Sequence, residues 1–289
     1  MNILSHPDVL LVHIGYLLMY VGLFFLAKWT KGLMVSYQLD AQLTEYDNKA
    51  VAISYSGFIL GITAIFAGAV AEGPAAATPS SGSLTEEFLS VAGYSLLGLA
   101  LLHLSRLVNS RLILSRFSVE KELIHDQNPG TGIVEAASYL SSGLIIAGAI
   151  YGEGGGLLSA LVFYSIGQVC LIAFGWLYQR LSPYDVHAEI EKDNTAAGVG
   201  FAGGLISIGI IIMKAVSGTF KSWAEDLAEV GVDVLIIFIY LIGVRLVFDR
   251  LVLRNSNLQN EIVRDQNLGA GILEMVVSVS FSAVLFFLL

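Results

Sequence analysis

The chain of 289 residues is 55% hydrophobic and only 13% charged, with a mean hydropathy of +0.74 and a formal net charge of −9. Because an ordinary soluble domain contains roughly 25% charged residues, this composition excludes a soluble enzyme or a soluble binding module. It indicates side chains that face lipid or other apolar helices.

Helices long enough to cross a membrane account for almost the whole chain. A bilayer core of about 30 Å requires roughly 20 apolar residues per spanning helix. In chain order, the predicted spans are Val9 to Ala27, Ala50 to Val70, Phe88 to Leu104, Gly132 to Ile150, Leu157 to Tyr178, Ala196 to Met213, Val232 to Phe248 and Gly269 to Leu289. The predicted fold class is therefore all-α, a polytopic bundle of about eight transmembrane helices.

Catalytic and redox motifs are missing from the sequence. Cys170, the only cysteine, lies in the fifth span and can form neither an intrachain disulfide nor a thiolate cluster. We find no HExxH motif, no G-x-S-x-G motif and no phosphate loop. We therefore expect no enzyme activity and no cofactor, and the sequence leaves metal binding open.

The distribution of basic residues predicts the orientation in the membrane, because Lys and Arg in short loops stay on the cytoplasmic side. Of the 15 basic residues, 13 lie near the loops that follow spans one, three, five and seven: Lys28, Lys31, Lys49, Arg106, Arg111, Arg116, Lys121, Arg180, Lys192, Arg245, Arg250, Arg254 and Arg264. We expect these loops in the cytoplasm and both termini outside. The cytoplasmic face is mixed in sign, which argues against nucleic acid as a partner.

A similar acidic passage occurs four times, each time at the cytoplasmic entrance to an even-numbered span. The four passages read LTEYDNKAVAISYSG from Leu43, ELIHDQNPGTGIVEA from Glu122, EIEKDNTAAGVGFAG from Glu189 and EIVRDQNLGAGILEM from Glu261. The second and fourth align at an offset of 139 residues, with 14 of 30 positions identical between Arg106 and Glu135. The first and third align at an offset of 146 residues.

This alternation predicts a duplicated four-helix unit, with residues 1–152 as the first unit and residues 153–289 as the second. Each unit contains two related hairpins. Since a hairpin has two spans, successive copies enter the membrane in the same direction, as parallel repeats related by an axis along the membrane normal. All four acidic passages should therefore gather on the cytoplasmic face.

The pattern E-[IL]-x-x-D-[Q]-N, in which the glutamine is optional, is followed by small residues and an apolar span and resembles the YjfL-type bacterial inner-membrane family, also called domain of unknown function 350. The resemblance covers the whole chain as a tandem pair and implies a multi-pass protein of the bacterial inner (plasma) membrane. The first passage departs from the pattern, with Leu43 where the others have Glu122, Glu189 and Glu261.

The acidic passages have a structural and a functional interpretation. Asp and Asn are favoured helix N-caps and suit the helix dipole. Alternatively, Asp47, Asp126, Asp193 and Asp265 form a ring of carboxylates that concentrates cations at a pore mouth. The candidate motif residues are Asp47, Asn48, Glu122, Asp126, Asn128, Glu189, Asp193, Asn194, Glu261, Asp265 and Asn267.

Glu135 and Glu274 lie inside spans, nine residues after Asp126 and Asp265. An ionisable side chain at that depth marks a functional site by default. It is either a proton- or cation-binding site, or a buried ion pair with Arg106 or Arg245, which end the preceding spans on the same side; exposure to lipid is a third alternative.

Two functions follow from these residues. The leading hypothesis is a channel or transporter for a small cation or protons that uses Glu135, Glu274, Arg106 and Arg245. Its rival is a non-transporting membrane anchor or sensor subunit that docks a cytoplasmic protein, for example in an envelope-stress system. The expected partners are the lipid bilayer, a small cation or proton, a cytoplasmic protein and further copies of the chain.

Overall fold

The computed structural model describes residues 7–71, 84–151, 154–247 and 258–289, although the side chains of 7–9, 241–242 and 244–247 are outside the description. The long helices are α1 (Pro7–Met34), α3 (Lys49–Ala71), α4 (Leu84–Leu112), α6 (Pro129–Ile150), α7 (Gly156–Leu181), α9 (Thr195–Val216), α10 (Trp223–Val247) and α11 (Leu268–Leu288). The short elements are α2 (Leu39–Thr44), α5 (Val119–Ile124), α8 (Val186–Glu191) and the π-helical turn η3 (Asn260–Arg264).

The prediction of an all-helical membrane bundle is confirmed. Seven helices within the described residues are long and apolar enough to cross a membrane. The eighth predicted span, Val232 to Phe248, falls on α10 as far as Val247, and Phe248 is outside the described residues. No strand occurs among the residues that the structure describes.

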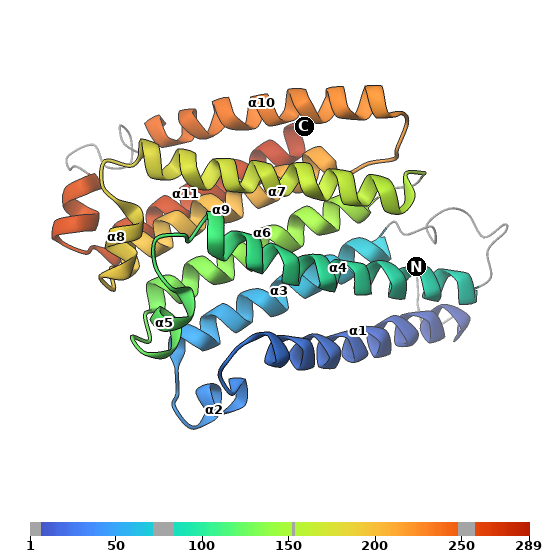
Figure 1. Cartoon of the computed structure of the whole chain (residues 1–289). Coiled ribbons are helices and arrows are strands. Elements are labelled where there is room, and N and C mark those ends of the chain that lie inside the picture. Colours follow the sequence, from blue (N-terminus) through green and yellow to red (C-terminus); the bar gives the residue numbers. More distant parts are fainter. Residues whose placement is uncertain (1–6, 72–83, 152–153, 248–257) are drawn as a thin grey trace.

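The long helices form two rows (Figure 1). In the inner row, α3 packs on α6, α6 on α9, and α9 on α11, so the helices that follow the four acidic passages are neighbours. The outer row consists of α1, α4, α7 and α10. Since α6 and α9 lie in the middle of the inner row, most of their residues are buried, whereas few residues of α1 and α11 are buried.

Small residues allow the helices of the inner row to approach closely, as is common for helix contacts in lipid. A Cβ atom at Gly143 of α6 would lie 2.5 Å from the Cα atom of Gly61 on α3. A Cβ atom at Gly198 of α9 would lie 2.8 Å from the Cα atom of Gly130 on α6. Side chains larger than hydrogen at these positions would push the backbones apart.

The short elements α2, α5 and α8 lie at one end of the bundle, and the connection from α9 to α10 lies at the other (Figure 1). The four acidic passages therefore gather at one end, which we call the capped end. The side of the membrane on which this end lies remains a prediction from the basic residues.

Candidate functional site

Each helix of the inner row begins at an asparagine whose side chain caps it. The Oδ1 atoms of Asn48 and Asn128 accept hydrogen bonds from Val51 N and Thr131 N, both at 3.1 Å. In the second half of the chain, the Oδ1 atoms of Asn194 and Asn267 accept equivalent hydrogen bonds from backbone N–H groups. Such a bond satisfies one of the backbone N–H groups left free in the first helical turn.

The expectation that aspartate shares this capping role is wrong. Asp47 and Asp193 directly precede the capping asparagine and adopt left-handed backbone conformations, with φ of 48° and 63°. In the other two passages, Gln127 and Gln266 take that position, with φ of 50° and 45°. The sharp turn that this conformation produces directs the asparagine into the helix start.

The same asparagines also connect one acidic passage to the next. The Nδ2 atom of Asn48 donates to the Leu123 carbonyl at 2.8 Å, Asn128 donates to the Ile190 carbonyl at 2.6 Å, and Asn194 donates to the Ile262 carbonyl at 2.7 Å. All three asparagines are at most 1% exposed. These bonds fix the four passages relative to one another at the capped end.

A second hydrogen bond of each asparagine corrects the sequence alignment of the first passage. Asn128, Asn194 and Asn267 donate to the carboxylates of Glu122, Glu189 and Glu261 at 3.0, 3.0 and 2.7 Å. Asn48 makes the same bond to the side chain of Gln42, at 2.8 Å. Gln42, and not Leu43, therefore occupies the position that glutamate occupies in the other three passages. All four passages share the motif, with glutamine in place of glutamate in the first.

Two of the four aspartates predicted to form a carboxylate ring are paired with a basic neighbour. Lys121 Nζ lies 3.0 Å from Asp126 Oδ2, and Arg264 Nε lies 2.8 Å from Asp265 Oδ1. The hydrogen bond from Arg264 lowers the pKa of Asp265. Asp47 and Asp193 are exposed. The ring remains a prediction, because these contacts show local pairing within a passage.

Glu135 lies inside the bundle, and the structure brings Arg106 to it. Arg106 Nε is 3.5 Å from Glu135 Oε1, and the Arg106 Nη1 atom also donates to the Met34 carbonyl at 3.0 Å. The hydroxyl of Ser54 on α3 donates to Glu135 Oε2. The carboxylate therefore has a cationic and a neutral partner, which reduces the cost of keeping it out of water.

A buried lysine, which sequence reasoning treated only as a topology marker, belongs to the same cluster. Lys31 is 1% exposed and donates to the Tyr139 hydroxyl, and its Nζ atom lies 4.4 Å from the centroid of the Tyr139 ring. Tyr37, in the loop after α1, has a raised pKa because it is buried, and the charge of Glu135 raises it further.

The interior next to Glu135 is tightly packed. The space lined by Arg106, Asn109, Glu135 and Tyr139 amounts to about 10 Å³, which is at most enough for one water molecule. Farther along α4, the Asn109 amide donates to Ser138 Oγ at 2.7 Å and accepts a hydrogen bond from Gln168. Asn109, Ser138 and Gln168 thus bond to one another across α4, α6 and α7.

Glu274 has a different environment in the second half. Tyr178 donates its hydroxyl to Glu274 Oε1 at 2.7 Å. Gly200, six residues after Asn194, stands where the first half has Ser54, and a Cβ atom there would lie 2.6 Å from Glu274 Oε2. The predicted partner Arg245 lies on α10, but its side chain falls outside the described residues.

The sequence contains a signal for this difference between the halves. Trp29 and Lys31 correspond to Trp176 and Tyr178 at a spacing of 147 residues, the same spacing that separates Gln42 from Glu189. Lys31 of the first half is therefore replaced by Tyr178 in the second, and each of them lies at the glutamate-containing cluster of its half.

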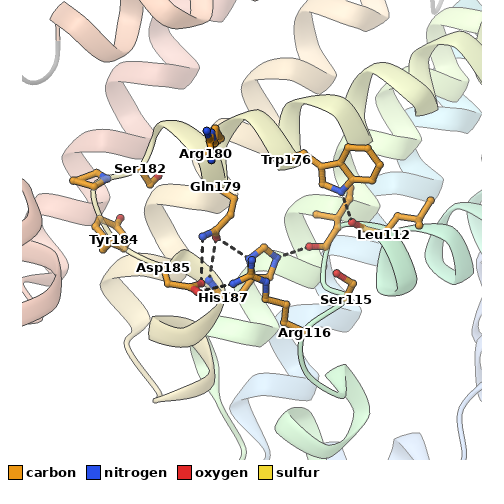
Figure 2. A pocket seen from close by; sticks show the side chains of 12 residues that line it. Leu112, Ser115, Arg116, Trp176, Gln179, Arg180, Ser182, Tyr184, Asp185 and His187 are labelled. Carbon is orange, nitrogen blue, oxygen red and sulfur yellow. Dashed lines mark hydrogen bonds and ion pairs between the residues drawn. The ribbon is translucent and has the colours of Figure 1, made fainter.

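A larger pocket of about 600 Å³ lies at the capped end between the α4–α5 loop and the α7–α8 loop (Figure 2). His187 spans it, with Nε2 2.6 Å from the Ile113 carbonyl and Nδ1 2.8 Å from Gln179 Oε1 (Figure 2). Arg116 pairs with Asp185 at 2.5 Å. The pKa of Asp185 is lowered, because hydrogen bonds and the Arg116 charge outweigh its desolvation.

These contacts hold the two loops together and use both ring nitrogens of His187. We therefore interpret this pocket as a structural joint, which the sequence did not predict.

Comparison with known proteins agrees with this architecture. A family model described as "Domain of Unknown Function (DUF350)" matches residues 6–150 and, again, residues 154–289. The chain is 25% identical over 151 residues to a protein of Aquifex aeolicus (strain VF5) described as "UPF0719 transmembrane protein". This alignment covers 49% of the chain and 56% of that relative. No solved structure matches the chain.

Proposed function

We propose that this chain, which belongs to the DUF350 family of uncharacterised transmembrane proteins and contains the family's domain twice in tandem, is a non-transporting membrane subunit. In this proposal the capped end binds a soluble protein. The observation that carries the proposal is the close packing beside Glu135, where the carboxylate is paired with Arg106 and the adjoining space is about 10 Å³.

The capped end has features that suit protein binding. Three cross-passage hydrogen bonds hold it in one arrangement, and exposed acidic and basic side chains alternate on it, including Lys121, Asp126, Lys192 and Arg264. A preorganised surface loses little conformational entropy when a partner binds. In keeping with the basic residues near this end, we propose the cytoplasm of a bacterial cell as the compartment of the partner.

Transport of protons or a small cation is the second candidate, and one observation favours it. Lys31, Arg106 and Glu135 lie together inside membrane-spanning helices. Ionisable residues in such helices are costly and commonly mark proton or ion pathways. For transport, the cluster would have to open to water on each side in turn.

Liposome flux combined with thermal stability separates the two candidates. We expect purified protein in liposomes to pass protons, Na⁺ and K⁺ no faster than protein-free liposomes do. Glu135→Gln should lower the melting temperature, because breaking a buried ion pair costs about 3–5 kcal/mol. Glu45→Gln, at an exposed position, is the matched control. Wild-type flux that Glu135→Gln abolishes while the protein stays folded would establish transport instead.

Site-specific photocrosslinking tests the binding role. A benzophenone amino acid at His125, an exposed residue directly after α5 at the capped end, should form an adduct with a soluble protein in living cells. The same group at Leu89, exposed near the opposite end of α4, is the control. The adduct should weaken in an Asp126→Lys background. Adducts with lipid alone at His125 would contradict the proposal.

A further inference from the structure

The hydrogen bond that joins successive acidic passages occurs three times. A fourth asparagine of the same kind lies at the end of the inner row. Asn48, Asn128 and Asn194 each donate to a carbonyl of the following passage. Asn267 caps α11 and donates to Glu261 in the same way as the others, but it is exposed and makes no such onward bond to any residue that the structure describes.

The helix face that leads to the next neighbour is also open in α11. We compared the positions two, six, nine and thirteen residues after each capping asparagine. They are buried in α3 (Ala50, Ser54, Gly57, Gly61), in α6 (Gly130, Val134, Ala137, Ser141) and in α9 (Ala196, Gly200, Gly203, Ser207). In α11 the same four positions, Gly269, Leu273, Val276 and Ser280, are all exposed.

The opposite edge of the row, on α3, presents the complementary face. In α6 this face carries Gly132, Ala136 and Gly143, which pack on α3. In α3 the residues at matching positions, four, eight and fifteen after the asparagine, are Ala52, Ser56 and Thr63, of which Ser56 and Thr63 are exposed. Small and hydroxyl-bearing residues are typical of helix contacts inside membranes.

We infer that the protein assembles head to tail, with α11 of one copy packed against α3 of the next copy. In this contact, Asn267 donates to the carbonyl of Leu43 in the neighbouring copy. Leu43 follows Gln42 as Leu123, Ile190 and Ile262 follow their glutamates, so it stands where the other three acceptors stand. A second copy fits this face because the contact continues an interface that the chain already forms three times.

This contact is heterologous, because each copy contributes two different faces; such contacts generate rings or open filaments rather than two-fold dimers. It would also cover α1, which is mostly exposed, whereas its counterparts α4 and α7 are each packed against two helices of the inner row. The inferred assembly thus gives the terminal helices of both rows the neighbours that the central helices have.

Two of the three internal interfaces predict which residues meet. Gly57 of α3 contacts Ala136 of α6, and Gly203 of α9 contacts Met275 of α11. Both pairs join the position nine residues after one asparagine to the position eight residues after the next. At the contact between copies, the equivalent pair is Val276 and Ser56.

Disulfide crosslinking in native membranes tests this register, in a Cys170→Ala background that removes the single natural thiol. The double variant Ser56→Cys, Val276→Cys should form covalent multimers on oxidation. Each single variant should remain uncrosslinked, and the two singles expressed together should give a dimer. Ser56→Cys combined with Val169→Cys, at an exposed position of α7, is the control. Absence of multimers, or a dimer from one single variant, would overturn the inference.

A steric variant provides the second measurement. Val276 is 49% exposed and Val169 is 64% exposed, so tryptophan at either position should leave the fold and the melting temperature of one copy unchanged. Native mass spectrometry from nanodiscs should find multimers for the wild type and for Val169→Trp, and single copies for Val276→Trp. A monomeric wild type would mean that lipid covers both faces, and multimers that survive Val276→Trp would mean that the copies meet through another surface. Either result would overturn the inference.

Discussion

At the scale of single residues, Asn128 shows how one side chain can stabilise several parts of the structure. Its Oδ1 atom caps α6, and its two amide hydrogens reach Glu122 and the Ile190 carbonyl. Buried polar groups are costly unless they are satisfied, and here every hydrogen-bonding group of the side chain has a partner. Asn267 has the first two of these bonds but not the third.

This difference predicts unequal effects of the same substitution. Asn128→Asp keeps the capping oxygen, but it removes both donors and places a carboxylate against Glu122. We expect a loss of roughly 1–3 kcal/mol for each buried bond that is broken, read as a lower melting temperature in detergent. Asn267→Asp, at an exposed site, should cost clearly less in dissociated single copies. Equal losses would show that the cross-passage bond contributes little.

Glu122 provides a prediction about pH. Burial raises the pKa of this carboxyl above its ordinary value of 4.5, so the fold disfavours the charged form. Below 4.5 the side chain is neutral in both the folded and the unfolded chain, and the penalty is absent. It grows as pH rises through the folded pKa and is complete above it.

We therefore expect the melting temperature of Glu122→Gln to rise relative to that of the wild type as the pH is raised from 4 to 7. The scale is roughly 2–4 °C for each kcal/mol. The glutamine should fit, because Gln42 accepts the same asparagine bond in the first passage. Glu45→Gln, at an exposed site, should show no such trend. A difference in melting temperature between Glu122→Gln and the wild type that stays constant with pH would exclude the burial penalty.

Sequence reasoning identified the ionisable residues of the first half only in part. Arg106 and Glu135 could be paired because they lie on the same side of neighbouring spans, and the structure places them together. Lys31 was missed, because a lysine near the end of a span also marks the cytoplasmic side, and only packing distinguishes the two roles. The asparagine bonds to the next passage were unpredictable, since their acceptors are backbone carbonyls that have no sequence signature.

At the scale of helices, glycines decide how close the members of the inner row can lie. The pattern of small residues predicted packing faces, but it could not say which helix each face meets. The structure shows that Gly57 lies against the backbone of Ala136, whereas Gly93 of α4 has no other atom within 4 Å of where its Cβ atom would be. Gly57 and Gly93 therefore serve different purposes.

Paired alanine substitutions test this distinction. Gly57→Ala should destabilise the protein by about 1–3 kcal/mol, because the added methyl group overlaps α6 and forces the helices apart. Gly93→Ala should be neutral or stabilising by up to about 1 kcal/mol, because alanine favours the helix. Unfolding in detergent measures both. A harmless Gly57→Ala would mean that the inner row is more loosely packed than described.

At the scale of the whole molecule, seven of the eight predicted spans match described helices that are long and apolar enough to cross a membrane, because these apolar runs are close to the length that a bilayer requires. The two-row arrangement did not follow from hydropathy, because it depends on which helix faces meet. Orientation is a separate question that charge alone addresses: basic residues predict that the capped end lies in the cytoplasm.

Cysteine accessibility in a Cys170→Ala background tests this orientation. Thr219→Cys, at an exposed position between α9 and α10, should react with a membrane-impermeant maleimide in intact spheroplasts. Glu45→Cys, exposed at the capped end, should react only after permeabilisation. Labelling in the opposite order would place the capped end outside and remove the cytoplasmic partner from consideration.

The repeated step along the inner row has an evolutionary consequence. Each hairpin enters and leaves the membrane on the same side, and the junction between the two units uses the same asparagine bond, Asn128 to Ile190, as the junctions within them. A gene encoding such a chain can therefore gain or lose hairpins by in-frame duplication or deletion without inverting the rest. Each helix pair added in this way arrives with a ready-made binding face, so relatives of different lengths can share a single mode of packing.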